Sequence, residues 1–194
     1  PFNILETEFI KQQTRLVFSR IGLQNPLDVD EYCNSGGYKG LEKSFEIGQQ
    51  KTIDEIKKSG LNGRGGAAFP TGIKMQTVFD QEAKTKYVAC NADEGDGGTF
   101  SDRLIMECDP FSLIEGMTIA AYSVGASHGY IYLRSEYPLA KYFLTEAIQI
   151  LKSNNLLGDK ILGKNFTFDI ELRIGAGSYV CGEETAMMES IEGK

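Results

Sequence analysis

The sequence lacks the features by which several classes of protein are recognised. Its four cysteines, Cys33, Cys90, Cys108 and Cys181, are too far apart for a C-x-x-C pair, which argues against a zinc or iron–sulfur site within these residues. Scattered single cysteines instead indicate buried thiols in a reducing compartment. The net charge is −7, and no basic patch with interleaved aromatic residues occurs, so general binding to nucleic acid is disfavoured.

Long apolar runs are also absent. The most apolar stretch, 111–126, contains Glu115 and is too short to span a bilayer, and no signal peptide is visible. We therefore expect a cytoplasmic protein, at most peripheral to the cytoplasmic face of a membrane complex. A length of 194 residues suits one domain, or one domain with an extension.

Glycine is abundant, at 22 of 194 positions, and five glycines fall within the stretch 60–74, Gly-Leu-Asn-Gly-Arg-Gly-Gly-Ala-Ala-Phe-Pro-Thr-Gly-Ile-Lys. Glycine lets the backbone approach a ligand closely, and a concave run of free N–H groups forms a phosphate cradle. Arg64 inside the run and Lys74 at its end would add positive charge. The stretch has neither the Gly-Lys-Ser/Thr ending of a Walker loop nor a G-x-G-x-x-G pattern. It indicates phosphate or nucleotide binding, and a plain glycine-rich turn is the alternative.

A second cluster is acidic and covers 91–96, Asn-Ala-Asp-Glu-Gly-Asp. Carboxylates and amides exchange hydrogen bonds with hydroxyl-rich groups such as ribityl and ribose chains. The spacing does not match the EF-hand, which argues against calcium, and an exposed polar loop is the alternative. Acids beside a cationic cradle suit a ligand with one phosphate and many hydroxyls. Flavin mononucleotide (FMN) fits that description, and a bare triphosphate fits poorly.

A third glycine-rich segment covers 175–182 and follows an expected strand. The two residues after it, Glu183 and Glu184, open an expected helix. Glycines between a strand and a helix are the context that a dinucleotide loop requires. The alternative role of the two carboxylates is to stabilise the positive end of the helix dipole.

The hydrophobic pattern predicts an α/β fold. The expected strands cover 86–90, 129–134 and 166–174, with the first of them buried. Because helices of about fifteen residues separate the strands, we expect parallel pairing, with ligands at the carboxyl ends of the strands. The expected helices are 29–33 (capped by Asp28), 39–46, 52–59 (with a Thr52/Glu55 capping box and Ile53, Ile56 and Leu61 on one face), 110–124, 138–152 and 183–191.

Three ordered motifs together resemble one known family. They are Gly63-Arg-Gly-Gly-Ala-x-Phe-Pro-Thr-Gly-x-Lys74, the stretch from Cys90 to Arg103, and Gly175-Ala-Gly-Ser-Tyr-Val-Cys-Gly-Glu-Glu-Thr-Ala186. The chain resembles the NADH-binding flavoprotein subunit of respiratory complex I (the family of 51 kDa subunits). This family includes the diaphorase subunits of NAD-linked formate dehydrogenases and hydrogenases. The resemblance runs from about Gln13 to Lys194.

The resemblance implies a site for each of two ligands. For FMN it implies Gly63, Arg64, Gly65, Gly66, Lys74, Asn91, Asp93, Glu94, Tyr179, Gly182, Glu183 and Glu184. For NAD(H) it implies Phe69, Asp96 and Glu184, and it implies neither a catalytic side chain nor a bound metal in these residues. Two positions depart from the family pattern: Ala68 stands where glycine is usual, so its backbone must avoid positive φ or be strained, and Asp96 stands where glutamate is usual.

The implied architecture is a Rossmann-like parallel sheet with flanking helices. We expect a mostly helical extension over 1–50 and an FMN/NADH-binding α/β domain over 51–194. The chain begins at Pro1 rather than Met and ends where the family usually continues, so we expect a fragment that lacks part of the C-terminal side of the domain.

The implied function is an FMN-dependent NADH dehydrogenase module. It would pass electrons to iron–sulfur clusters, with a 4Fe–4S cluster in a C-terminal region outside this sequence and others in partner subunits of a larger redox complex. The parent complex could equally be an NAD-dependent formate dehydrogenase or a hydrogenase. Two further alternatives are a non-redox nucleotide-binding module and an interaction scaffold whose glycine loops are purely structural.

Overall fold

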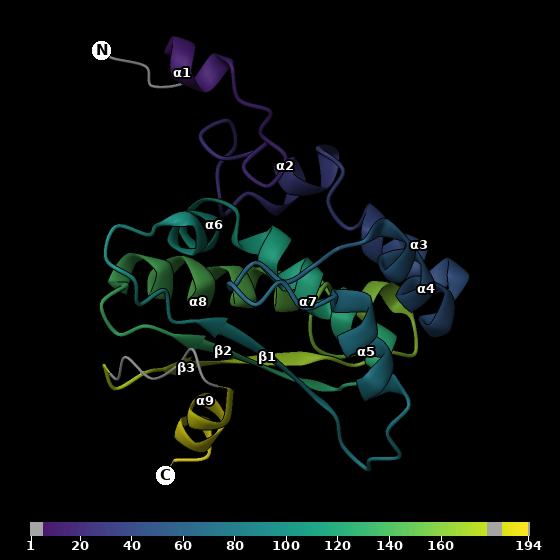
Figure 1. Cartoon of the computed structure of the whole chain (residues 1–194). Coiled ribbons are helices and arrows are strands. Elements are labelled where there is room, and N and C mark those ends of the chain that lie inside the picture. Colours follow the sequence, from purple (N-terminus) through teal and green to yellow (C-terminus); the bar gives the residue numbers. More distant parts are fainter. Residues whose placement is uncertain (1–5, 178–183, 194) are drawn as a thin grey trace.

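The computed structural model describes residues 6–177 and 184–193 and has an α/β architecture (Figure 1). A parallel sheet lies beneath a layer of helices, and the N-terminal helices lie above and beside that layer. The elements in chain order are α1 (Glu8–Lys11), α2 (Val29–Asn34), α3 (Lys39–Ile47), α4 (Gln49–Ser59), α5 (Thr71–Phe79), β1 (Tyr87–Ala92), α6 (Ser101–Cys108), α7 (Pro110–Val124), β2 (His128–Leu133), α8 (Pro138–Ser153), the 3₁₀ helix η2 (Ile161–Gly163), β3 (Asp169–Ile174) and α9 (Glu184–Ile191).

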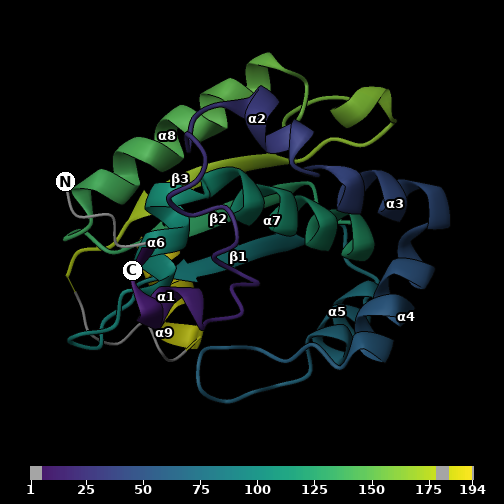
Figure 2. The same cartoon turned by 90° about the horizontal axis from the view of Figure 1, so that it is seen from above.

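The described sheet has the order β1-β2-β3, and both pairs of strands are parallel. Ala89 of β1 lies opposite Tyr130 of β2, which lies opposite Glu171 of β3. Helices α6, α7 and α8 form the layer over one face, and α9 lies on the other (Figures 1 and 2). The parallel α/β fold expected from the sequence is confirmed.

Alternation along the strands separates a covered face from an open one. Ile131 and Leu133 of β2 are fully buried beneath the helices. The prediction that the first strand is buried is wrong, since Tyr87 of β1 is 55% exposed. The face of the sheet that carries Tyr87 is exposed along β1, because α9 covers only the end of this face near Tyr132. There the Tyr132 hydroxyl pairs with Ser190 Oγ at 2.8 Å.

The predicted start of α4 is also wrong. The helix begins at Gln49, three residues early, and Gly48 with φ +86° precedes it. Thr52 therefore lies inside the helix, and its hydroxyl donates to the Gly48 carbonyl at 2.9 Å instead of capping. Leu61 lies beyond the helix and is 48% exposed, so it does not share the buried face of Ile53.

The other predicted helices are present, but none of the predicted helices lies at the positions of α1, α5, α6 and the 3₁₀ helix η2. The expected bounds of α7 are confirmed, and the Asp28 carboxylate caps α2 by accepting from Glu31 N at 2.8 Å. Helix α5 begins at Thr71, inside the first glycine-rich stretch, and α6 follows the acidic loop. The sequence pattern indicated no helix at either place. In α5, Gly72 allows the helix to pass very close to α4, because a Cβ at this position would lie 2.7 Å from the backbone nitrogen of Lys57.

One buried carboxylate of α7 contacts the N-terminal helices α2 and α3. Glu115 of α7 accepts from the Tyr32 hydroxyl at 2.6 Å, from Tyr38 N at 2.8 Å and from Leu41 N at 3.3 Å. It thus caps α3, whose own N-terminal residue Tyr38 provides no side-chain cap. The described part of residues 1–50 shares one hydrophobic core with the following residues, and the division at residue 50 stays a prediction.

None of the helices within residues 6–177 and 184–193 combines the length and the apolar composition needed to cross a membrane.

Removal of the Glu115 carboxylate should destabilise the protein strongly. Glu115→Ala leaves two buried N–H groups and a buried hydroxyl without their acceptor, so we expect the free energy of unfolding to fall by about 3 kcal/mol. Denaturant titration measures this value. Glu55→Ala, at an exposed position of α4, is the control and should change it by less than about 0.5 kcal/mol. A loss below about 1 kcal/mol for Glu115→Ala would show that these contacts do not hold the N-terminal helices in place.

Candidate functional site

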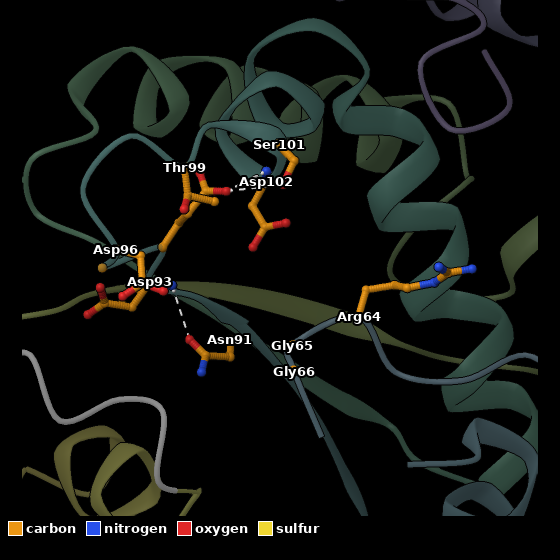
Figure 3. Close-up of a pocket in the computed structure, with 11 residues that line it drawn as sticks. Arg64, Gly65, Gly66, Asn91, Asp93, Asp96, Thr99, Ser101 and Asp102 are labelled. Atoms are coloured by element: carbon orange, nitrogen blue, oxygen red, sulfur yellow. Dashed lines mark hydrogen bonds between the residues drawn. The ribbon is translucent and has the colours of Figure 1, made fainter. Parts of the chain in front are cut away.

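A cavity of about 690 Å³ lies at the carboxyl end of β1 (Figure 3). Three segments form its walls: the first glycine loop, the end of β1 with the acidic loop, and the first turn of α6. The lining residues are Arg64, Gly65, Gly66, Asn91, Asp93, Glu94, Gly95, Asp96, Thr99, Ser101 and Asp102. The cavity therefore occupies the position at which open α/β sheets bind their ligands.

The glycine loop is a narrow excursion between α4 and α5. Its base is closed by hydrogen bonds from Gly63 N to Phe69 O and from Thr71 N to Leu61 O, each 2.9 Å long. The residues between them project away from the helices, and Gly65 and Gly66 bring backbone to the cavity. A Cβ at Gly65 would meet no atom within 4 Å, so there is open space in front of this backbone.

Ala68, in the same loop, has φ +51°. The sequence required this residue either to avoid positive φ or to be strained, and the structure has the strained conformation. A side chain in this region costs roughly 1 kcal/mol, because its Cβ crowds the backbone. The loop thus carries a small conformational strain beside the cavity.

The acidic loop begins with a turn formed by Asn91, whose side-chain oxygen accepts from Asp93 N at 3.1 Å. Carboxylates of Asp93, Glu94, Asp96 and Asp102 all lie among the lining residues. In Figure 3 the Asp93 and Asp96 side chains lie close together on one side of the cavity. The described lining is therefore strongly negative.

Glu94 is the buried member of this group, with 6% of its surface exposed. Its carboxylate accepts from Ser101 Oγ at 3.2 Å, from Asp102 N at 3.0 Å and from Arg103 N at 3.2 Å. It thus caps the N-terminus of α6 from seven residues upstream. The side chain predicted to hold FMN is already fully engaged with the protein, and it holds the first turn of α6 against the cavity.

Asp102 points into the cavity from this first turn (Figure 3). Burial raises the pKa of its carboxyl group, and repulsion from Glu94 adds to the effect. Burial raises the pKa of the Cys90 thiol on β1 to about 12, and the charge of Asp102 contributes to this rise. Cys90 is therefore a protonated thiol at neutral pH, without nucleophilic character.

The two predicted cations do not form a common cradle. Arg64 lines the cavity, but its guanidinium group extends away from Asp93 and Asp96 (Figure 3). Lys74 belongs to α5, and its ammonium nitrogen lies 6.0 Å from the centre of the Phe69 ring. Neither Lys74 nor Phe69 nor Gly63 lines the cavity. The structure thus does not bring the two cations together, and the cradle closed by both stays a prediction.

Half of the third motif, residues 178–183, lies outside the described residues, and this half contains the expected site residues Tyr179, Gly182 and Glu183. Glu184 is placed only as the first residue of α9. Conversely, Thr99, Ser101 and Asp102 line the cavity although the sequence reasoning assigned them no role. Their position within the second motif, which ends at Arg103, could have identified them as candidate site residues.

Comparison with known proteins identifies the family. The model of the Nuo51 FMN-binding domain matches residues 56–194. The chain belongs to this family. Its predicted resemblance to the complex I flavoprotein is thereby confirmed.

Similar proteins come from two kinds of complex. The HndC subunit of the NADP-reducing hydrogenase of Solidesulfovibrio fructosivorans is 47% identical over 95% of this chain and 37% of its own length. The F subunit of the NADH-quinone oxidoreductase of Aquifex aeolicus is 49% identical over 86% of this chain and 39% of its own. A crystal structure of an NAD⁺-reducing [NiFe]-hydrogenase in the air-oxidised state superposes with a TM-score of 0.70 at 30% identity, over 94% of this chain and 28% of that one.

The chain spans less than two-fifths of the length of these two curated relatives. The part matched by the family model, 56–194, includes all three sequence motifs.

Replacement of Ala68 by glycine should relieve the backbone strain at this position, and the same replacement at Ala67 is the control. Glycine adopts positive φ freely, so Ala68→Gly should not lower the free energy of unfolding and should raise it by up to about 0.5 kcal/mol. Ala67→Gly, at a neighbour with ordinary φ, should lower it by about 0.5 kcal/mol, because it only adds entropy to the unfolded chain. Equal losses in the two variants, measured by chemical denaturation, would mean that residue 68 is not strained.

Proposed function

We propose that this chain is the FMN- and NAD(H)-binding module of an electron-transferring flavoprotein. The observation that carries the proposal is the cavity at the carboxyl end of β1, because two motifs that are distant in sequence and both typical of the family form its walls. Its volume of about 690 Å³ lies within the usual range for sites of small ligands and cofactors.

The polar groups of the cavity suit FMN. Backbone at Gly65 and Gly66 can approach a phosphate closely, as the open space in front of Gly65 allows. Asn91 and Asp93 offer amide and carboxylate groups to ribityl hydroxyls. Bound FMN would supply the redox chemistry, accepting a hydride from NADH and releasing single electrons, while the side chains orient the two ligands and exclude water.

The proposed site for the nicotinamide cofactor consists of Phe69, Asp96 and Glu184. Phe69 is half exposed at the base of the glycine loop, so its ring is available for stacking on a planar group. Gly63, Lys74, Tyr179, Gly182 and Glu183 complete the proposed sites. Closure of the loop over a ligand would bring Arg64 nearer to the phosphate than it is here.

Electrons would leave toward iron–sulfur clusters in other parts of a multi-subunit complex, peripheral to the cytoplasmic face of the membrane. The 49% identity with one component of an NADH-quinone oxidoreductase favours a complex of that kind. A second candidate is an NAD(P)-linked hydrogenase, which the 47% identity with HndC favours.

The bound cofactor should be FMN at about one molecule per chain. The natural full-length protein is purified, denatured, and its released flavin is identified by mass. Recovery of FAD, or of no flavin, would contradict the proposal and favour a non-redox nucleotide-binding module.

Substitution at Gly65 tests whether the cavity is the flavin site. In Gly65→Val the side chain meets no protein atom near its Cβ and projects into the cavity, so it should weaken FMN binding at least about tenfold without unfolding the chain. Gly116→Val, at an open position on α7, is the matched control and should bind FMN normally. Equal flavin content in the two variants would place FMN elsewhere.

Glu184 should disfavour NADPH relative to NADH. A carboxylate accepts a hydrogen bond from a free ribose 2′-hydroxyl and repels a 2′-phosphate. Glu184→Ala should therefore lower the ratio of kcat/KM for NADH to kcat/KM for NADPH by about tenfold. Glu189→Ala, at an exposed position on the same helix, should leave the ratio unchanged. An unchanged ratio in Glu184→Ala would remove this residue from the nicotinamide site.

A further inference from the structure

The turn between β2 and α8 holds the acidic loop from behind the cavity. Arg134 Nη1 donates to the backbone carbonyl of Glu94 at 2.7 Å, and the Tyr137 hydroxyl lies 3.3 Å from the same oxygen. The Tyr137 hydroxyl also donates to the Glu94 carboxylate at 3.2 Å. Neither Arg134 nor Tyr137 lines the cavity, so their contacts act on the loop and not on a ligand within it.

Both side chains are fixed by further contacts. The guanidinium carbons of Arg103 and Arg134 each lie 5.7 Å from the centre of the Tyr137 ring. Arg134 also pairs with Glu136 at 3.1 Å, and its backbone N–H donates to Ala92 O at 3.3 Å, at the end of β1. Burial, and then the Glu94 carboxylate, raise the pKa of Tyr137, so its hydroxyl remains a proton donor at neutral pH.

The contacts of Arg134 and Tyr137 converge on Glu94, the residue that joins two walls of the cavity. The Glu94 main chain lies between Asp93 and Asp96, and its carboxylate caps α6, from which Ser101 and Asp102 face the cavity. A hydrogen bond of 3.2 Å from Thr99 N to Asp96 O lies within the loop and adds no link to the sheet. Fixing Glu94 from behind therefore fixes the acidic side chains on both sides of it.

We propose that Arg134 and Tyr137 are positioning residues for the nicotinamide substrate, which they affect through Glu94 and the acidic loop. This inference rests on the proposed function. Loss of either contact lets the loop sample more conformations, and the substrate must then order it on binding. The expected signature is weaker substrate binding with little change in the chemical step.

The test compares two conservative variants with two matched controls in the natural full-length protein carrying its flavin. Tyr137→Phe removes only the hydroxyl, and Arg134→Lys keeps the charge but loses the guanidinium fork. Tyr142→Phe alters an exposed tyrosine on α8. Arg15→Lys alters a guanidinium that donates to the Ile21 carbonyl at 2.6 Å, in the N-terminal segment.

Steady-state oxidation of NADH with an artificial one-electron acceptor gives kcat and KM, and hydrogen exchange of residues 93–101 reports the loop itself. For each test variant we expect KM to rise about fivefold and kcat to change less than about twofold, with faster exchange in the loop. The two controls should match the unaltered protein in all three measurements.

An unchanged KM with flavin bound would overturn the positioning role, even if the melting temperature fell, because a purely structural contact alters stability alone. A fivefold rise of KM in the controls as well would also overturn it. Absence of flavin from the unaltered protein would instead overturn the proposed function together with this inference. Hydrogen exchange would then still report whether the turn holds the loop.

Discussion

The candidate site depends on the hydrogen bonds that the Glu94 carboxylate accepts from the first turn of α6. A helix begins with N–H groups that lack intrahelical partners, and here Glu94, seven positions before the first residue of α6, accepts from two of them. The same bonds hold the acidic loop against the first turn of α6. Because one carboxylate orders both segments, the loop and the helix form adjoining walls of the cavity. The charge of Glu94 is directed at protein donors, so the ligand meets chiefly Asp93, Asp96 and Asp102.

Sequence periodicity predicted the elements whose stabilising residues are local. The strands alternate, and α7 and α8 each begin with a proline that suits the first turn of a helix. Helix α6 could not be found in this way, because its cap comes from Glu94 across an irregular loop. Helix α4 was placed three residues late because Thr52 and Glu55 imitate a capping box that tertiary packing overrides: Thr52 is buried within the helix.

Motif order predicted the location of the candidate site better than its geometry. Open α/β sheets bind ligands at the carboxyl ends of their strands, and this rule predicted a site at the acidic loop, which follows β1. The glycine loop lies between α4 and α5 and follows no strand, so only the family resemblance predicted that it would meet the acidic loop. The direction of a long side chain does not follow in this way. Arg64 turns outward and Lys74 contacts Phe69, because nothing in residue spacing specifies a rotamer at an exposed position. Neither could spacing show that Ala68 adopts φ +51°.

The cap that Glu115 provides for α3 has a consequence for synthesis of the chain on the ribosome. The capped N–H of Leu41 precedes its acceptor by 74 residues. At translation rates of roughly 5–20 residues per second, about four to fifteen seconds pass between the emergence of the two groups. During this interval Tyr32 and Leu41, both buried in the folded protein, have no α7 to pack against. The N-terminal helices of the nascent chain therefore complete their packing only after α7 has left the ribosome.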